Sequence, residues 1–413
     1  MYLTLFTDNT GKVREHRQLK MLGQTGSGWV EPMSVEMMPL PKGASLVLMP
    51  GHIPVGIKSD RPVPLTGSRH NQGQYSAVAA LLPQGFTRTL LPAAVATDHN
   101  DLPLLGYTAV GLRDEQIYVA AIKTDEHRKW HPKNYNTERL PEKITAFLKR
   151  YPHNRIIRQL ANCALEYSCF TAQNLFYRRW EAGIPTSKPC NANCIGCISE
   201  SHTSAFSAQN RLEFSPETGE IVELGAAHLA AAKEAIISFG QGCEGEPSLN
   251  ADKIGAAIRI IRQQTDKGTI NMNTNAGFTE GIRKLCDAGL DSIRVTMFSP
   301  LQEDYNYYHR PQNYRFSNVL KSIHYASDHQ VKVSINLLTY PGFTDRPEQV
   351  EPLLKLIHKT KIDMIQLRNL NIDPKYMLPL KTVSEPLGIP QFIKVIKQEA
   401  PGITVGSYSR PVR

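Results

Sequence analysis

Three cysteines, Cys190, Cys194 and Cys197, stand on one short segment in the pattern CxxxCxxC. Thiolates are the soft ligands that iron–sulfur clusters require, and three of them on one loop suit three corners of a cubane [4Fe–4S] cluster. The missing fourth cysteine would leave one iron open to a small molecule. Zinc usually takes four protein ligands in a closed site, or three and a water. The pattern favours a cluster with one open iron; three unrelated buried cysteines or a zinc knuckle are the alternatives.

The segment from about residue 183 to 400 resembles the radical S-adenosylmethionine (radical SAM) superfamily, because CxxxCxxC is followed there by alternating strand and helix patterns. The resemblance implies that the open iron binds the amine and carboxylate of S-adenosylmethionine (SAM). It also implies that an electron from the cluster cleaves SAM to a 5′-deoxyadenosyl radical. A reductant such as flavodoxin or ferredoxin would supply that electron.

Several residues match positions at which this family binds SAM. Gly245-Glu246-Pro247 resembles the Gly-Gly-Glu segment that holds the methionyl amine, and Glu244 is the competing carboxylate. A cation beside an iron needs a carboxylate, and a backbone passing that close needs glycine. The other candidates lie near the ends of expected strands: Asn275, Thr296 (ranked before Ser299), Ser299, Asn336 and Arg368. Asn336 could equally be a satisfied core amide, and Arg368 could meet the SAM carboxylate or the substrate.

Cys243 lies within the same glycine-rich segment and is the candidate catalytic residue. It could donate a hydrogen atom or carry a methyl group; a structural thiol is the alternative. The segment from Asp304 to Arg310 is rich in hydrogen-bonding rings and could admit a substrate, or be an ordinary polar loop. Relatives usually carry an aromatic residue just before the last cysteine, where this chain has Gly196. Adenine must then rely on aliphatic contacts or on the Leu337–Tyr340 region.

The elements that would position these residues alternate between strand and helix from Ile184 onward. After a first strand ahead of the cysteine loop, strands are expected at 235–240, 269–275, 292–299, 332–339 and 364–369, and helices at 216–234, 252–264, 279–288, 316–327, 347–359 and 391–399. Buried apolar strands alternating with helices favour a parallel sheet with helices outside. Six such units match the partial (β/α)6 TIM-like barrel of the radical SAM family, a core domain over 183–400 with a tail over 401–413. Chemistry in such barrels lies at the carboxyl ends of the strands.

Residues 1–125 are expected to form a β-rich N-terminal domain of unknown role. Apolar runs at 44–57 and 75–95 are broken by Gly and Pro, which indicates short strands in a small sandwich or barrel. The strands 107–112 and 116–122 should form a hairpin around Arg113-Asp114-Glu115. The segment GQTGSG (Gly23–Gly28) lacks the Lys-Ser/Thr of a phosphate loop, so a flexible loop is expected there.

Residues 126–182 are expected to form a basic helical connector. Ile157, Leu160, Ala161, Ala164 and Ser168 recur at helical spacing. Residues 121–180 hold twelve Lys and Arg but only five Asp and Glu, which could serve RNA, an acidic peptide or a phosphorylated substrate, or be the solvated side of a helix pair. On one helix Cys163 and Cys169 would point about 240° apart, so core cysteines are favoured over a second metal site. His127 and His131 are interpreted as a surface pair.

Composition sets the broad class of the protein. At 413 residues, with 21% charged and 41% hydrophobic residues, the chain should fold into two globular domains. It has no apolar window of about 18 residues that could span a membrane. The N-terminus lacks the features of a secretion signal. Seven cysteines, three of them on one loop, suit a reducing compartment. Cytoplasmic localisation and an anaerobic or low-oxygen organism are therefore expected.

The leading hypothesis is an enzyme that reductively cleaves SAM to modify an unknown substrate, a peptide, a protein or an RNA. The alternative is a non-catalytic iron–sulfur or zinc-binding protein, with the cysteines serving structure or electron transfer. No cysteine follows Cys286, so the auxiliary-cluster domain common in peptide-modifying relatives is not expected. No Asp-x-His-x-x-Gly segment occurs either, so the usual cobalamin-binding domain is not expected.

Overall fold

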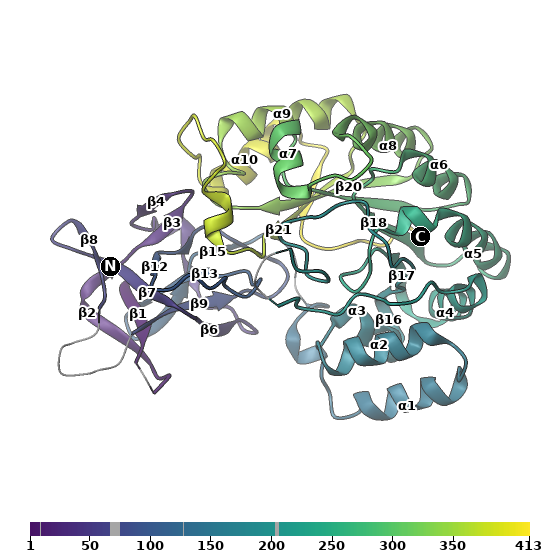
Figure 1. Ribbon diagram of the computed structural model, residues 1–413, viewed down its shortest axis with the longest axis horizontal. Helices are drawn as coiled ribbons and strands as arrows, with labels where there is room; N and C mark the ends of the chain where they lie inside the picture. Colours follow the sequence, from purple (N-terminus) through teal and green to yellow (C-terminus); the bar gives the residue numbers. More distant parts are fainter. Residues whose placement is uncertain (9, 67–74, 127, 203–205) are drawn as a thin grey trace.

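The computed structural model describes residues 1–8, 10–66, 75–126, 128–202 and 206–413. An N-terminal group of strands lies on one side of the molecule, and a parallel sheet covered by helices lies on the other (Figure 1). Three connector helices, α1 (Leu140–Arg150), α2 (Arg155–Leu165) and α3 (Phe170–Tyr177), follow the N-terminal strands and lie beside the start of the parallel sheet. No helix among the described residues is long and apolar enough to cross a membrane.

The N-terminal part is β-rich, as expected. Its main sheet is antiparallel and has the order β12-β7-β2-β1-β9-β13-β14-β5, with β6 paired to β9 and β8 paired to β7. The strands are β1 (Leu3–Thr7), β2 (Val13–Met21), β5 (Met38–Pro39), β6 (Ser45–Met49), β7 (His52–Lys58), β8 (Arg61–Pro64), β9 (Ser76–Leu81), β12 (Ala94–Ala96), β13 (Thr108–Arg113) and β14 (Gln116–Val119). The hairpin of β13 and β14 is confirmed, and its turn residues Asp114 and Glu115 have φ values of 49° and 58°. A two-residue hairpin turn of this kind needs positive φ at both positions.

The segment GQTGSG is not a flexible loop, and that expectation was wrong. It forms a hairpin of β3 (Gly23–Thr25) and β4 (Gly28–Val30), with β11 (Leu91–Pro92) alongside β3. At its tip the Gly26 N–H donates to the carbonyl of Pro341, 2.9 Å away. A Cβ on Gly342 would lie 1.9 Å from the Gly26 nitrogen, so glycine permits this approach. A contact with a segment more than 300 residues away orders the hairpin, and local sequence does not reveal such a contact.

The connector is helical, but a break separates two of its helices. Ile157, Leu160, Ala161 and Ala164 form the expected buried stripe on α2. Ser168, expected to continue that stripe, lies after the end of α2 with a φ of 49°. The turn places Cys169 at the N-cap of α3, where its N–H donates to the carbonyl of Cys163. The helical angle expected between these cysteines therefore does not apply.

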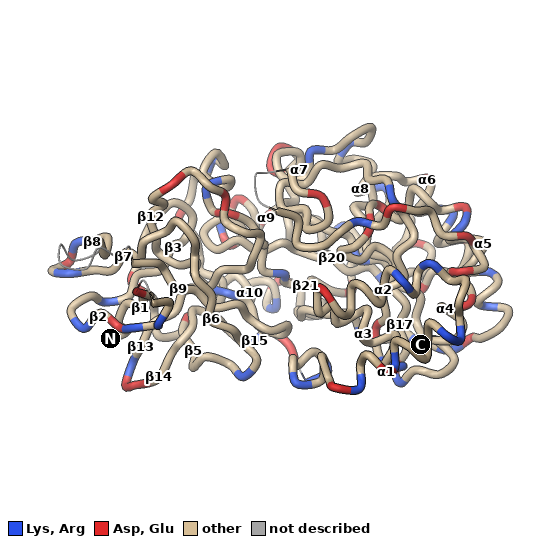
Figure 2. Tube along the Cα trace, turned by 60° about the horizontal axis from the view of Figure 1, so that its bottom comes forward, with Lys and Arg blue, Asp and Glu red and all other residues tan. Residues whose placement is uncertain are grey.

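Many of the basic residues of this region have partners within the chain. Lys and Arg alternate with Asp and Glu along the segment that leads from β15 (Ala121–Lys123) into α1 (Figure 2). Arg155 forms an ion pair with Glu220, and Arg179 lies over the rings of Tyr135 and Tyr177. His131 caps a short 3-10 helix at Pro132–Asn134, whereas His127 lies outside the described residues. These contacts favour the interpretation of the segment as a solvated, internally paired face.

The second part is an open, curled parallel sheet with helices on its outside (Figure 1). Its described strands follow chain order: β16 (Arg179–Gly183), β17 (Lys233–Phe239), β18 (Thr269–Thr274), β19 (Ser292–Met297), β20 (Lys332–Thr339), β21 (Met364–Asn369) and β22 (Thr404–Gly406). The helices are α4 (Thr218–Ala231), α5 (Ala251–Gln264), α6 (Thr279–Asp287), α7 (Gln302–His309), α8 (Phe316–Asp328), α9 (Pro347–Lys359) and α10 (Ile389–Glu399). The parallel α/β architecture agrees with expectation. The short β22 within the expected C-terminal tail, and α7 within the expected ring-rich loop, were not foreseen.

Hydrogen bonds join the N-terminal strands to the carboxyl end of β21. Arg88, at the end of β10 (Phe86–Arg88), is fully buried and donates to the carbonyls of Leu370 and Tyr107 at 2.7 and 3.2 Å. The Asn369 side chain accepts from the Arg88 N–H and donates to the Phe86 carbonyl. Burial lowers the pKa of Arg88 to about 10, so the guanidinium stays charged at neutral pH. The N-terminal part thus lies at the edge of the parallel sheet where barrels of this kind perform chemistry.

Candidate cofactor and active site

The cysteine loop follows β16 and is held by the glycine-rich turn after β17. The N–H groups of Gly245 and Glu246 donate to the carbonyls of Ser187 and Pro189 at 2.7 and 2.8 Å. A Cβ on Gly245 would lie 2.1 Å from the Pro189 oxygen, so a larger residue could not occupy this position without moving the loop. The two segments that the sequence singled out are therefore in direct contact.

Helix α7 holds the other side of the cysteine loop. The N–H groups of Asn193 and Ile195 donate to carbonyls at the end of α7. His309 Nδ1 lies 3.3 Å from Cys194 Sγ, and His309 Nε2 accepts from the Phe298 N–H at 3.2 Å. Because Nε2 accepts, the ring proton is assigned to Nδ1, which donates to the cysteine sulfur. Burial lowers the pKa of His309 to about 3, so the ring is neutral.

The other thiols also have polar neighbours. Arg211 Nη2 and Ser199 Oγ each lie 3.7 Å from Cys197 Sγ. Burial raises the pKa of Cys190 to about 11, and burial also raises the pKa of Cys194 well above its ordinary value. Within the described residues no group of three or more His, Cys, Asp or Glu side chains could hold a single metal ion. A cubane instead binds each thiolate at a different iron, and its charge holds the ligands deprotonated.

Both glutamates of the glycine-rich turn are buried, but their carboxylates accept different numbers of hydrogen bonds. Glu244 accepts five hydrogen bonds, from the N–H groups of Thr186, Ser187, Gly240 and Gln241 and from the Thr186 hydroxyl. Glu246 accepts three, from the Ser248 and Asn275 N–H groups and the Thr274 hydroxyl. A carboxylate offers about four acceptor positions. Glu246 therefore accepts fewer hydrogen bonds from the chain than Glu244 does.

A cavity of about 380 Å³ opens beside the cysteine loop at the carboxyl ends of β17 to β21. Cys194, Cys197, Glu244, Thr296, Asn336 and Arg368 are among the residues that line it. Asn336 lies beside Thr296 across the β19–β20 pairing, and its amide donates weakly to the Thr296 hydroxyl at 3.4 Å. Asn336 Oδ1 and Gln241 Nε2 are buried in this wall without a hydrogen-bond partner among the described residues. Unpaired buried polar atoms are costly, so they indicate a polar ligand.

Five of the expected cofactor residues do not line this cavity: Gly245, Glu246, Pro247, Asn275 and Ser299. The last three support the turns around it. Ser299 is fully buried; its hydroxyl donates to Gln349 and accepts from the Leu301 N–H at the start of α7. Asn275 donates to the Asn191 side chain of the cysteine loop. Pro247 opens the short 3-10 helix Pro247–Asn250, which Glu246 caps. The structure therefore places Ser299, Asn275 and Pro247 as supports of the turns and does not bring them into the cavity.

Cys243 points away from the cavity and is 2% exposed. Its thiol contacts that of Cys163 on α2, within the hydrophobic core. The hydrogen bond with Cys163, together with burial, raises the pKa of Cys243 well above its ordinary value, so the thiol is neutral. The structure does not bring this candidate catalytic residue to the residues that could bind a substrate.

Sequence reasoning missed the roles of α7, which it took for a loop. Tyr305, Tyr308 and His309 form its buried face. A Cβ on Gly196 would lie 2.6 Å from the Tyr308 hydroxyl, so the glycine in the cysteine loop makes room for this ring. Tyr308 lines the cavity, and so an aromatic side chain from α7 stands next to the position where an aromatic was expected in the loop. The ring-rich composition of 304–310 was the available signal.

Comparison with known proteins decides the family. The profile described as the Radical SAM superfamily matches residues 184–357. This segment belongs to the radical SAM superfamily. It contains the cysteine loop, the glycine-rich turn and the strands β17 to β20.

Several solved structures are similar to the chain in fold. One is a radical SAM methyltransferase from Sphaerobacter thermophilus, with 17% identity over 56% of this chain and 66% of that chain, and a TM-score of 0.41. Another is methylornithine synthase, with 13% identity over 58% of this chain and 68% of that chain, and a TM-score of 0.40. A third is Streptococcus suis SuiB bound to precursor peptide SuiA, with 12% identity over 74% of this chain and 70% of that chain, and a TM-score of 0.41. The chain thus spans about two thirds of the length of these proteins, and no curated protein matches it in sequence.

The cofactors of the radical SAM domain are a [4Fe–4S] cluster and SAM. The residues present fit both groups. Three thiols lie on the loop, a donor from α7 contacts one of them, and the adjoining cavity has buried polar atoms without partners among the described residues. Superfamily membership also supports an enzyme over a structural iron–sulfur protein.

Proposed function

We propose that the protein is a radical SAM enzyme in which Cys190, Cys194 and Cys197 hold the cluster and the adjoining cavity holds SAM. The observation that carries the proposal is the contact of the cysteine loop with the Gly245–Glu246 turn beside a cavity lined by unpaired polar atoms. When bound, the cluster supplies the electron that cleaves SAM to a 5′-deoxyadenosyl radical.

Three side chains would hold SAM in this proposal. Glu246 accepts a hydrogen bond from the methionyl ammonium, because its carboxylate accepts fewer hydrogen bonds from the chain than that of Glu244. Thr296 and Asn336 meet the polar ribose or carboxylate groups, and Asn336 Oδ1 gains the partner that it lacks. Gly245 contributes through its lack of a side chain, which lets the turn approach the cysteine loop.

The remaining residues position these groups. His309 donates to Cys194, and Arg211 places a positive charge beside Cys197. Donors of this kind orient cluster ligands and stabilise their negative charge. Tyr308, which lines the cavity next to Gly196, gives the adenine ring an aromatic neighbour.

The proposed division of labour follows the expected domain bounds. Residues 183–400 carry the cofactors, 126–182 connect and brace the start of the sheet, 1–125 cover the carboxyl ends of its later strands, and 401–413 close its edge. In this proposal the substrate is a peptide, a protein or an RNA.

The test is anaerobic reconstitution of the full chain with iron and sulfide. We expect about four irons per chain, an electron paramagnetic resonance spectrum of the reduced cluster that changes on SAM addition, and 5′-deoxyadenosine after reduction. The triple variant Cys190→Ala, Cys194→Ala, Cys197→Ala should show none of these three properties. Cys286 is buried on α6, away from the loop, so Cys286→Ala should show all three. Zinc in place of iron, or a spectrum indifferent to SAM, would refute the proposal.

A further inference from the structure

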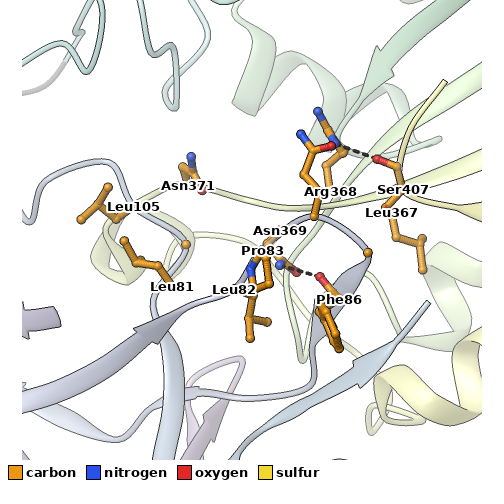
Figure 3. A pocket seen from close by; sticks show the side chains of 13 residues that line it. Leu81, Leu82, Pro83, Phe86, Leu105, Leu367, Arg368, Asn369, Asn371 and Ser407 are labelled. Atoms are coloured by element: carbon orange, nitrogen blue, oxygen red, sulfur yellow. Dashed lines mark hydrogen bonds between the residues drawn. The ribbon is translucent and has the colours of Figure 1, made fainter. Parts of the chain in front are cut away.

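A second cavity, of about 330 Å³, lies between the N-terminal strands and the end of β21 (Figure 3). The loop after β9 and the segment before β13 supply one wall, which includes Leu81, Phe86 and Leu105. Leu367, Arg368 and Asn369 of β21 supply the opposite wall. Arg368, Asn369 and Asn371 also line the proposed SAM cavity, so the two cavities adjoin. The volume falls within the range of small-molecule sites, about 300–1,000 Å³.

Arg368, the cationic side chain that lines this cavity, has no acidic partner of its own. Arg368 Nη1 donates to the Ser407 carbonyl at 2.7 Å, as Figure 3 shows. Glu181 acts on the charge of Arg368, but it already forms an ion pair with Arg294 at 2.9 Å. None of the described residues that line the cavity is Asp or Glu. A guanidinium in such surroundings favours a planar anion, because its fork of N–H groups matches a carboxylate.

Two further polar atoms in the cavity wall lack partners among the described residues. They are Gln84 Oε1, from the N-terminal part, and Ser407 Oγ, from the turn after β22. Gln84 Oε1 can only accept, so it needs a donor such as an N–H group. Asn369 and Asn371 add polar groups from the end of β21, and the apolar side chains Leu81, Leu82 and Leu105 lie on the N-terminal side. A matching ligand therefore combines a carboxylate, an N–H group and an apolar side chain.

We propose that this cavity binds the substrate through an amino acid unit with a free carboxylate and an apolar side chain. Such a unit is either a free amino acid derivative or the C-terminal residue of a peptide. The carboxylate pairs with Arg368, the N–H group with Gln84, and the side chain contacts the leucines of the N-terminal wall. The assignment rests on the proposed function, since the shared residues place the bound unit next to the SAM cavity. It also gives residues 1–125 a role, which is to complete the substrate site.

The test measures binding of defined probes to SAM-saturated, reconstituted holoenzyme by anaerobic calorimetry. The probes are N-acetyl-L-leucine and the tripeptide Ala-Ala-Leu, each compared with its C-terminal amide. We expect each carboxylate that binds to do so at least tenfold more tightly than its amide. Binding of the acetylated amino acid alone indicates a small-molecule substrate, and binding of the tripeptide alone indicates a peptide C-terminus. Failure of both carboxylates to bind at millimolar concentration, or equal binding of the amides, overturns the assignment.

Two substitutions locate the site. Arg368→Gln should weaken binding of the probe by a factor at least ten times larger than the factor by which it weakens binding of SAM. Leu105→Trp fills the cavity from the N-terminal side, so it should also weaken binding of the probe. Arg410→Gln is the matched control, because Arg410 is 56% exposed and pairs with Asp125 outside the cavity. If Arg368→Gln loses more affinity for SAM than for the probe, the assignment is overturned. Failure of the proposed function is seen separately, as absence of 5′-deoxyadenosine from the wild type.

Discussion

His309, on helix α7, links the cysteine loop to the chain just after β19 through two hydrogen bonds of one ring, and substitutions can separate these bonds. Gln places its side-chain oxygen near the position of Nε2, so His309→Gln keeps an acceptor for the Phe298 N–H and loses the donor to Cys194. Asn places its side-chain nitrogen near Nδ1, so His309→Asn keeps the donor and leaves the Phe298 N–H unpaired.

The magnitudes follow from the surroundings of each bond. His309 is 1% exposed, so an unpaired Phe298 N–H cannot turn to water and His309→Asn should lower the free energy of unfolding by about 1–3 kcal/mol. Loss of the donor to a cluster ligand typically weakens metal affinity by about 10–100-fold, which is about 1.4–2.8 kcal/mol. His309→Gln should therefore lose iron more readily. Its reduction potential should also become more negative, because the donor stabilises the additional negative charge of the reduced cluster.

Three measurements distinguish the two variants. Thermal unfolding of the apoprotein reports the Phe298 bond, iron retained against a chelator reports cluster affinity, and a redox titration reports the potential. His324→Gln, at an exposed position of α8, is the control for handling and reconstitution. Iron retention and a potential in His309→Gln that equal those of the wild type would refute a role of His309 in holding the cluster ligand.

Three further substitutions test other parts of the structure. Glu246→Gln should weaken SAM binding at least tenfold, since a hydrogen bond to a charged group contributes about 1.5–3 kcal/mol. Unchanged SAM binding in equilibrium dialysis would contradict this. The thiol of Cys243 fills space in the core, so Cys243→Ala should lower the free energy of unfolding by about 1–3 kcal/mol while SAM is still cleaved. Loss of SAM cleavage at unchanged stability would instead support a catalytic role for Cys243. Burial alone would raise the pKa of Glu220, but its bonds with Arg155 and backbone N–H groups outweigh burial and bring it to about 2. Glu220→Gln should therefore cost about 1 kcal/mol at pH 7, discounted for solvent screening, and the difference in chemical denaturation should disappear as the pH falls from about 5 to about 2.

Much of the radical SAM domain was predictable because its signals are local. The strands Lys332–Thr339 and Met364–Asn369 and the helix Pro347–Lys359 have the bounds expected from the sequence. Apolar runs, caps and prolines act within a few residues, so they can be recognised without the fold. Helix α7 was missed because its buried face consists of Tyr and His, whose polar atoms suggested a loop.

The sequence alone indicated the chemistry proposed for this protein, since residue type and the short spacing of Cys190, Cys194 and Cys197 restrict the ligand. The tertiary structure decided which other residues serve that chemistry. It placed Cys243 in the core, left Glu246 with fewer hydrogen bonds than Glu244, and brought His309 to Cys194 from 115 residues away. The physical reason is that hydrogen-bond saturation and burial depend on neighbours distant in the chain. Only folding brings those neighbours together.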